Sequence, residues 1–328
     1  MSLQARRIIL TGRVQGVGFR PFVYNAAVRL GINGSVYNGS GKVFIHAEAS
    51  PARLDEFEQL LLDGAPPLAR PVLGSSEAVT VEQARRFEIL ASSASAEAEI
   101  HVPPDLFTCD DCLAELGGRD ERRYGYPFIN CTQCGPRYTI ITAMPYDRPN
   151  TSMAGFPLCD ACRAEYESPA DRRFHAQPLA CPECGPELTY ISAHGGGVEN
   201  PLKAAVQAIR SGSIVAVKGV GGYHLVCDAG NDEAVRLLRE RKRRPHKPLA
   251  VMFPWCGQDG MQALHGELEL DEVTAAALVD PARPIVLVRK SSRTSLSEFL
   301  APGLDELGVF LPYSPLHHEL LAELGGPI

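Results

Sequence analysis

The feature that most constrains this chain is a cysteine-rich sequence that occurs twice. Each copy reads Cys-x2-Cys-x18-Cys-x2-Cys. The first copy contains CDDCLAEL at 109–116 and CTQCGPRYT at 131–139, and the second contains CDACRAEY at 159–166 and CPECGPELT at 181–189. Between them, RRYGYPF in the first copy corresponds to RRFHAQP in the second. A period held this closely indicates a duplicated structural unit.

The cysteine spacing predicts metal binding. A Cys-x2-Cys turn brings two thiolates close enough to share a tetrahedral zinc ion, and two such turns complete its shell. We therefore predict two structural Zn²⁺ sites, because four sulfurs leave no open position for catalysis. Sequential pairing gives one site from Cys109, Cys112, Cys131 and Cys134 and another from Cys159, Cys162, Cys181 and Cys184; a nested pairing of the first turn with the last is the alternative. Cys227 and Cys256 are interpreted as small buried residues.

Composition and charge narrow the class of protein. A chain of 328 residues is long enough for two or three domains. The net charge of −7 argues against a general nucleic-acid or membrane-surface binder. We find no apolar run long enough to span a membrane and no signal pattern, so we expect a cytoplasmic protein with no membrane or nucleic-acid partner. Paired cysteines in a reducing compartment fit metal sites better than disulfides.

Small-residue and glycine-rich stretches divide the sequence. ASSASAEAEI at 91–100 and SAHGGGVENP at 192–201 are interpreted as linkers. The expected domains are therefore 1–91, 104–190 and 200–328, in a multidomain α+β protein.

The amino-terminal stretch LTGRVQGVGFRPF at 10–22 follows a hydrophobic run and precedes an expected helix. It is neither a complete dinucleotide fingerprint nor a Walker loop. Backbone N–H groups of residues 15–20 at a helix N-terminus would hold a phosphate, and Arg20 would add a charge-assisted hydrogen bond. The alternative is that Arg20 is a solvated surface arginine and Asn38 a turn residue.

L-x-G-x-V-Q-G-V-x-F-R at 10–20 resembles the signature of acylphosphatases, and residues 8–90 are similar to that family throughout. The resemblance implies a ferredoxin-like sandwich, with strands near 6–14, 34–39, 42–49 and 78–81 and helices near 21–31 and 51–63. It implies two catalytic residues: Arg20 binds the phosphate and Asn38 orients the attacking water. The implied phosphate-binding residues are Gln15, Gly16, Val17, Gly18, Phe19 and Arg20.

The third segment alternates helix and strand patterns. PLKAAVQAIRSG at 201–212 predicts an amphipathic helix, SIVAVKG at 213–219 a buried strand, and NDEAVRLLRERKRRP at 231–245 a helix with a basic end. Lys218 lies at the carboxyl end of the strand, where ligands of α/β sheets bind. The basic end could equally be a solvated helix terminus that matches the helix dipole.

This segment resembles the YrdC-like nucleotide-binding domain, whose Lys-x-Arg-Pro…Pro-Leu element matches KRRPHKPL at 242–249. The nucleotide-binding residues implied by the resemblance and by position are Lys218, Tyr223, His224, Arg241, Lys242, Arg244 and Lys247. His317 and His318 match no metal-protease pattern and are interpreted as packing or helix-terminal residues. The YrdC-like α/β domain is expected to be incomplete, because the sequence ends at Ile328.

The order of the three parts resembles the HypF family of carbamoyltransferases in [NiFe]-hydrogenase maturation, with CTQCGPRYT and PYDRPNTSM as specific stretches. The resemblance implies that carbamoyl phosphate is hydrolysed at the opening loop, and that the carbamate is joined to ATP, with Mg²⁺, as carbamoyl-adenylate. In full-length members of the family, a TsaD-like domain then passes the carbamoyl group to the C-terminal cysteine of HypE. That domain is expected to be absent here.

Two other functions fit parts of the sequence. An enzyme that makes threonylcarbamoyl-adenylate for tRNA modification accounts for the third segment only. A non-enzymatic zinc scaffold that binds nucleic acid or proteins is supported by RRPHK at 243–247 and by the arginines of the cysteine-rich segment. The tRNA-modification function leaves the opening loop and the cysteines unexplained.

Overall fold

The computed structural model describes residues 3–39, 41–66, 68–90, 103–144, 146–192 and 198–328. These residues form two compact units, one of Met1–Asp105 with Asn130–Gly185 and one of Leu106–Ile129 with Pro186–Ile328. The three-domain division expected from the sequence remains a prediction. The linker expected at 91–100 and the glycine run within the linker expected at 192–201 lie outside the described residues.

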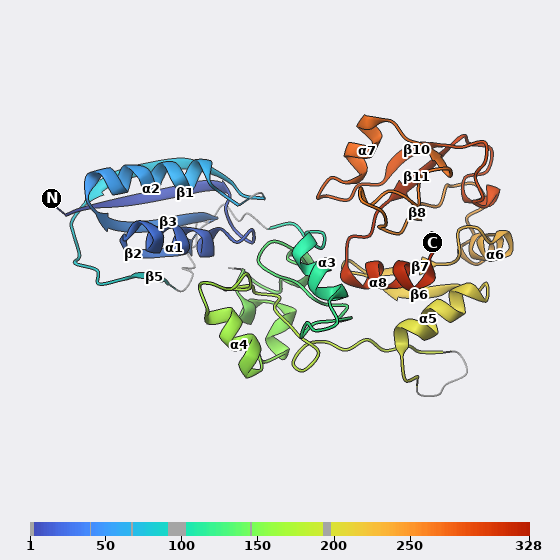
Figure 1. Ribbon diagram of the computed structural model, residues 1–328, viewed down its shortest axis with the longest axis horizontal. Coiled ribbons are helices and arrows are strands. Elements are labelled where there is room, and N and C mark those ends of the chain that lie inside the picture. The colour runs from blue at the N-terminus through green and yellow to red at the C-terminus, as the bar shows by residue number, and fades with distance from the viewer. Residues whose placement is uncertain (1–2, 40, 67, 91–102, 145, 193–197) are drawn as a thin grey trace. The chain divides into compact units, whose positions relative to one another are not determined.

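The first unit contains a five-stranded sheet with the order β4-β1-β3-β2-β5 (Figure 1). Its strands are β1 (Gln4–Arg13), β2 (Asn33–Gly39), β3 (Lys42–Ala49), β4 (Arg70–Val79) and β5 (Phe87–Ile89). Only β2 and β5 pair in parallel. Helices α1 (Phe19–Leu30) and α2 (Pro51–Asp63) pack against each other and against the sheet. The resulting β1-α1-β2-β3-α2-β4 order confirms the expected ferredoxin-like sandwich.

Apolar residues at alternate strand positions build the core of this sandwich. Ile8 and Leu10 on β1 are fully buried, and they join Ile45 on β3 in one cluster. The helices contribute Val23 and Phe57 to the same cluster. The period-two pattern of the strands and the helical period of the helices thus meet in one core, which explains why the resemblance predicted β1 to β3 well.

The prediction of a strand near 78–81 was wrong in its extent. Strand β4 begins at Arg70 and ends at Val79, and a further short strand, β5, follows at Phe87. Most residues of β4 are exposed, because it forms an edge of the sheet. An edge strand with few buried residues lacks the apolar alternation that marks a strand in a sequence.

The cysteine-rich part of the first unit has little regular structure. It contains one helix, α4 (Asp160–Glu167), and three short 3-10 helices, η1 (Tyr138–Ile140), η2 (Arg148–Asn150) and η3 (Ser152–Gly155). The guanidinium of Arg148 donates hydrogen bonds to the backbone carbonyls of Phe156, Gln177 and Leu179. Hydrogen bonds from a side chain to the backbone therefore stabilise loops that lack regular secondary structure.

The cysteines form two groups, each with its sulfur atoms within 4.8 Å of one another. The groups are Cys109, Cys112, Cys131 and Cys134, and Cys159, Cys162, Cys181 and Cys184. This grouping follows the sequential pairing, not the nested one.

Sulfur geometry within these groups fits zinc. Sγ–Sγ distances are 3.8 Å for Cys131 with Cys134 and 3.7 Å for Cys181 with both Cys159 and Cys184. A tetrahedral ion with Zn–S distances of about 2.3 Å requires sulfurs about 3.8 Å apart. The backbone N–H of Gln133 also donates to Cys131 Sγ, as suits a thiolate. Both clusters therefore fit structural zinc.

The second unit contains a four-stranded sheet, β8-β11-β10-β9, and a separate hairpin of β6 and β7. The strands are β6 (Val215–Lys218), β7 (Tyr223–Val226), β8 (Val251–Met252), β9 (Leu268–Glu269), β10 (Val286–Lys290) and β11 (Glu306–Phe310). The helices are α3 (Asp110–Gly117), α5 (Pro201–Arg210), α6 (Asp232–Lys242), α7 (Glu272–Leu278), α8 (Pro315–Leu324) and the 3-10 helix η4 (Glu298–Leu300). None of the helices in the described parts of the chain has the length and apolar character that a membrane crossing requires.

Local signals explain the elements around the hairpin. Asn200 and Asn231 cap α5 and α6 with side-chain hydrogen bonds to Lys203 N and Ala234 N. The strand expected at 213–219 is present as β6, but the prediction that it is buried was wrong for Ala216 and Lys218, which are exposed. Among the described strands β6 pairs only with β7, so its exposed residues face a cavity rather than a core.

We predict two zinc ions per chain, measured by atomic absorption on the purified protein. Cys162 is fully buried within its cluster, so Cys162→Ser should reduce the content to one and expose the second cysteine repeat to proteolysis. Cys256→Ser is the matched control, because Cys256 belongs to neither cluster; it should retain two. Two zinc ions in Cys162→Ser would contradict the assignment.

We also predict that acid destabilises the second unit through two histidines of α8. Burial lowers the pKa of His317 to about 3 and that of His318 to about 4. The unfolded chain, with histidine pKa values near 6.5, binds these protons more readily, so stability falls as the pH decreases from about 6.5 toward 4. The slope is at most about 1.4 kcal/mol per pH unit per histidine.

The measurement is urea unfolding followed by the fluorescence of the single tryptophan, Trp255, which lies in this unit. The double variant His317→Gln, His318→Gln should show a shallower dependence between pH 6.5 and 4. Identical slopes for the variant and the wild type would refute this explanation.

Candidate active site

A small pocket lies where the loop before α1 meets the cysteine-rich part of the same unit. Its cavity volume is about 30 Å³, room for roughly two water molecules. The sandwich contributes one set of lining residues: Val14, Gly16, Gly18, Phe19, Arg20, Pro21 and Asn38. The cysteine-rich part contributes the other set: Thr132, Arg137, Tyr146, His175, Ala176, Gln177 and Pro178.

The loop needs its two glycines for conformation and for space. Gly16 and Gly18 have φ angles of 69° and 71°, in the left-handed region. A Cβ on Gly16 would lie 2.3 Å from Pro103 Cβ, and one on Gly18 would lie 2.5 Å from Gln133 Nε2. Gly18 is also the N-cap of α1 and makes no side-chain cap. Gly18 therefore has no side chain that could compete with an anion at the start of α1, and a helix N-terminus favours an anion.

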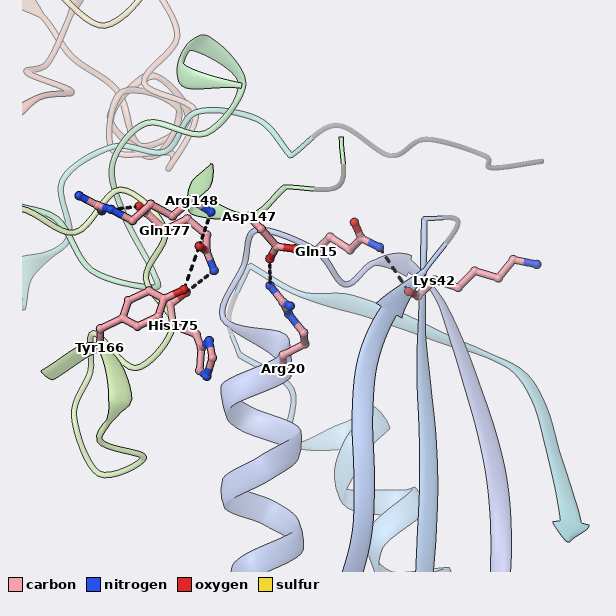
Figure 2. Close-up of polar contacts among 8 residues, drawn as sticks. All are labelled: Gln15, Arg20, Lys42, Asp147, Arg148, Tyr166, His175 and Gln177. Atoms are coloured by element: carbon pink, nitrogen blue, oxygen red, sulfur yellow. Dashed lines mark hydrogen bonds and ion pairs between the residues drawn. The ribbon is translucent and has the colours of Figure 1, made fainter. Parts of the chain in front are cut away.

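Arg20 extends from the first turn of α1 into this pocket. Its side chain is 10% exposed, and its Nη2 donates to Asp147 Oδ1 at a distance of 3.0 Å (Figure 2). A guanidinium carries five N–H donors in a fixed plane, so the ion pair orients the group beside the loop. Arg20 is therefore buried and held in place, which excludes the alternative of a solvated surface arginine.

Asn38 reaches the pocket from the end of β2. It is 3% exposed, and its backbone is fixed by the pairing of β2 with β3. Among the described residues no group forms a hydrogen bond with Asn38 Oδ1. A buried amide oxygen of this kind is suited to accept a hydrogen bond from a water or a ligand. Asn38 is thus a strand residue, not a turn residue.

A hydrogen-bond network positions the opposite wall (Figure 2). The side-chain oxygen of Gln177 accepts from Arg148 N at 2.7 Å and from Tyr166 Oη at 3.0 Å. Gln177 Nε2 donates to the backbone carbonyl of His175 at 3.1 Å. The His175 ring packs against Tyr166 and Phe174, with centroids 5.0 and 4.6 Å apart. The His175 imidazole is thereby held at the pocket.

Electrostatics keeps two wall residues neutral. Burial and the nearby Arg20 cation lower the pKa of His175 to about 4, although Asp147 opposes the shift. Burial raises the pKa of Tyr146 to about 12. At neutral pH both side chains are therefore uncharged, and Arg20 provides the positive charge next to the loop.

Arg137 connects the loop to a cysteine turn. It is 2% exposed. Its Nε donates to the carbonyl of Gly16 at 2.9 Å, and its Nη atoms donate to the carbonyls of Cys131 and Cys134 at 3.1 and 2.6 Å. One buried guanidinium thus joins the Gly16–Gly18 loop and the Cys131–Cys134 turn.

The structure brings together most, but not all, of the residues predicted for the phosphate site. Gly16, Gly18, Phe19, Arg20 and Asn38 line the pocket. The side chains of Gln15 and Val17 do not line it: Gln15 Nε2 donates to the carbonyl of Lys42, and Val17 is in the core.

Sequence reasoning missed the residues of the opposite wall. Tyr146 and Asp147 lie in PYDRPNTSM and His175 lies in RRFHAQP. The first stretch is specific to the family that the sequence resembles, and the second follows the period of the repeat. Neither pattern indicates that these residues lie near Arg20.

A second cavity, of about 1110 Å³, lies in the second unit beside β6. Three of the predicted nucleotide-binding residues line it: Lys218, Tyr223 and Arg241. Lys218 and Tyr223 are exposed and lie opposite each other in the β6–β7 hairpin. The cavity therefore combines cationic groups, an aromatic ring and apolar walls.

The other predicted residues lie elsewhere in the unit. His224 Nε2 is 2.9 Å from Tyr313 Oη, and burial lowers the pKa of His224. Lys242, Arg244 and Lys247 are not among the residues that line the cavity. Lys242 and Lys247 are exposed, and Arg244 donates to the carbonyl of Pro248.

Protein-family models match most of this chain. The acylphosphatase family matches residues 6–89, the HypF finger matches residues 108–141 and 158–191, and the telomere recombination family of Sua5, YciO and YrdC matches residues 207–328. The three matches follow one another in the expected order.

Curated relatives match the whole length of the chain. It is 51% identical over 328 residues to carbamoyltransferase HypF of Rhodobacter capsulatus, covering 99% of this chain and 42% of the relative. It is 43% identical over 322 residues to the probable carbamoyltransferase HypF of Methanocaldococcus jannaschii, covering 96% of this chain and 41% of the relative. The chain thus spans about two fifths of the length of these relatives.

Solved structures of HypF proteins match the fold of this chain over nearly its whole length. A full-length HypF in a phosphate- and nucleotide-bound form superposes with a TM-score of 0.93 at 41% identity, covering 99% of this chain and 42% of that one. HypF of T. kodakarensis superposes with a TM-score of 0.86 at 41% identity, covering 99% and 41%. Sequence, domain order and fold therefore agree that the chain belongs to the HypF family, whose relatives are named carbamoyltransferases.

Proposed function

We propose that the pocket around Arg20 hydrolyses carbamoyl phosphate, as the first step of a HypF-type carbamoyl transfer. The observation that carries this proposal is the convergence of Arg20, Asn38 and the Gly16–Gly18 loop in one buried pocket. A similar full-length HypF has a phosphate- and nucleotide-bound form, which is consistent with a protein of this family that binds phosphate. We place the reaction in the cytoplasm, where the paired cysteines stay reduced for zinc.

The chemistry follows from the groups present. The N–H groups at the start of α1 and the Arg20 guanidinium hold the phosphoryl oxygens and stabilise their charge. Asn38 Oδ1 accepts a hydrogen bond from a water and directs its oxygen to phosphorus. The bond from phosphorus to the carbamoyl oxygen breaks as the new P–O bond forms. Carbamate leaves as an anion and the water's proton passes to a phosphate oxygen, so the products are carbamate and dihydrogen phosphate.

The second cavity supplies the following step in this proposal. Lys218 and Arg241 would neutralise the phosphates of ATP bound with Mg²⁺, and Tyr223 would provide a face for stacking. Lys242, Arg244 and Lys247 are proposed to assist as the nucleotide binds. Carbamate then displaces pyrophosphate and forms carbamoyl-adenylate, and the carbamoyl group is passed to the C-terminal cysteine of HypE.

We expect the chain to release phosphate from carbamoyl phosphate, and Arg20→Ala to lower kcat/KM at least about 100-fold because the charge-assisted phosphate contact is lost. Asn38→Ala should lower kcat by a similar factor with little change in KM, since it acts on the water. Phosphate release is measured directly and corrected for spontaneous decomposition.

Arg53→Ala is the matched control, because Arg53 is an exposed arginine of the same unit on α2. It should retain wild-type activity. A wild-type chain that releases no phosphate would favour the scaffold function, and threonine-dependent use of ATP would favour the tRNA-modification function.

We further expect Lys218→Gln to weaken the binding of MgATP about tenfold or more, because a cation at the cavity is removed. Isothermal titration calorimetry provides the dissociation constant. Lys203 is an exposed lysine of α5 that does not line the cavity, so the Lys203→Gln variant should bind MgATP as the wild type does. Equal loss in both variants would remove Lys218 from the site.

A further inference from the structure

Two buried polar atoms in the pocket form no hydrogen bond with any described residue: Asn38 Oδ1 and Tyr146 Oη. Tyr146 is 4% exposed. A buried hydroxyl without a partner costs stability, so such groups are uncommon unless a ligand completes them. The hydrolysis proposed above gives Asn38 a water. It assigns no hydrogen-bond partner to the Tyr146 hydroxyl, although Arg20 is close enough to affect the pKa of this tyrosine.

The backbone conformation of His175 also indicates a functional role for this wall of the pocket. The two cysteine repeats place their backbones alike here: the N–H of Gly125 donates to the carbonyl of Leu116, and the N–H of His175 donates to the carbonyl of Tyr166, both at 2.9 Å. The φ angles are 61° at Gly125 and 55° at His175. The first repeat thus has glycine at a left-handed position where the second has histidine. Strain of this kind concentrates at functional sites.

The space beside these two side chains is small. The cavity volume is about 30 Å³, and the His175 ring is fixed by Phe174, Tyr166 and the hydrogen bond from Gln177 to its carbonyl. With a phosphate on the glycine loop and Arg20, the remainder of an acyl phosphate must lie against the wall from the cysteine-rich part. The packed His175 ring reduces the space for an acyl group beside this wall.

We propose that Tyr146 and His175 are specificity-determining residues that select a small acyl group carrying N–H, as carbamoyl phosphate does, over alkyl and aryl acyl phosphates. The inference rests on the proposed hydrolysis at this site. Tyr146 Oη accepts a hydrogen bond from an N–H of the carbamoyl group, and the His175 ring limits the size of the acyl group. Since both side chains are neutral, they bind the acyl group without competing with Arg20 for the phosphate.

Acetyl phosphate is the most informative competitor, because its methyl group has nearly the size of the carbamoyl NH₂ but cannot donate a hydrogen bond. A site built around a hydrogen bond rejects an analogue that leaves its buried polar group unpaired. The wild-type chain should therefore prefer carbamoyl phosphate to acetyl phosphate in kcat/KM, and should hydrolyse benzoyl phosphate poorly.

Tyr146→Phe tests the hydroxyl. It should lower kcat/KM for carbamoyl phosphate about tenfold, the effect of one hydrogen bond, and leave that for acetyl phosphate within about twofold. Its melting temperature should equal or exceed that of the wild type, because no hydrogen bond to a described residue is lost. Tyr138→Phe is the control, because Tyr138 is 64% exposed. Loss of its hydroxyl should change kcat/KM for neither carbamoyl phosphate nor acetyl phosphate.

His175→Gly tests the size limit with the residue that the first repeat already uses. Glycine suits the left-handed backbone, so the variant should fold, as its melting temperature will show. It should gain at least about tenfold in kcat/KM for benzoyl phosphate and keep the preference for carbamoyl over acetyl phosphate.

These measurements separate the two proposals. If the wild type hydrolyses none of the three compounds, the proposed hydrolysis fails. If it hydrolyses them but Tyr146→Phe reduces carbamoyl and acetyl phosphate equally, or His175→Gly gains no benzoyl phosphate activity, the hydrolysis stands and the inference about specificity is overturned.

Discussion

The hydrogen bonds of the buried Arg137 guanidinium are the interaction on which the candidate active site depends. Removing an arginine from water costs several kcal/mol unless its donors are paired. Here they are paired with backbone carbonyls of Gly16, Cys131, Thr132 and Cys134. The same group therefore fixes the glycine loop and a turn of the cysteine repeat. Zinc bound by Cys131 and Cys134 would hold this turn and, through Arg137, would help to maintain the shape of the loop.

This arrangement explains why an acylphosphatase-like sandwich is joined to a cysteine-rich segment. The sandwich brings the general chemistry for phosphate: a loop at a helix N-terminus, a cation and an amide that can direct water. The cysteine-rich segment brings Asp147 to Arg20 and brings Tyr146 and His175 to the other side of the cavity. Because few of its residues form helices or strands, its precision comes from arginine–carbonyl hydrogen bonds and from metal ligands.

Much of this could be predicted from short-range patterns. The eight zinc ligands follow from the spacing of a repeat, although that spacing left the sequential and nested pairings open. Arg20 and Asn38 follow from a motif that resembles a known family. Strands with buried alternate residues were located closely, whereas the exposed edge strand β4 was not.

The rest depends on contacts between residues far apart in the sequence. Asp147 is 127 positions from Arg20, and nothing local predicts their ion pair. The repeat aligns His175 with Gly125, but only the backbone conformation shows that this position is left-handed. The nucleotide site is intermediate: β6 was predicted, but which cationic side chains line its cavity depends on how α6 ends, at Arg243 in a left-handed conformation.

A crystal structure of the chain with phosphonoacetamide, a stable analogue of carbamoyl phosphate, tests the central claim most directly. The account predicts the phosphonate on the N–H groups of the Gly16–Gly18 loop and on Arg20, with the amide within hydrogen-bond distance of Tyr146 Oη. An amide that faces bulk solvent, or a phosphonate bound away from Arg20, would contradict it.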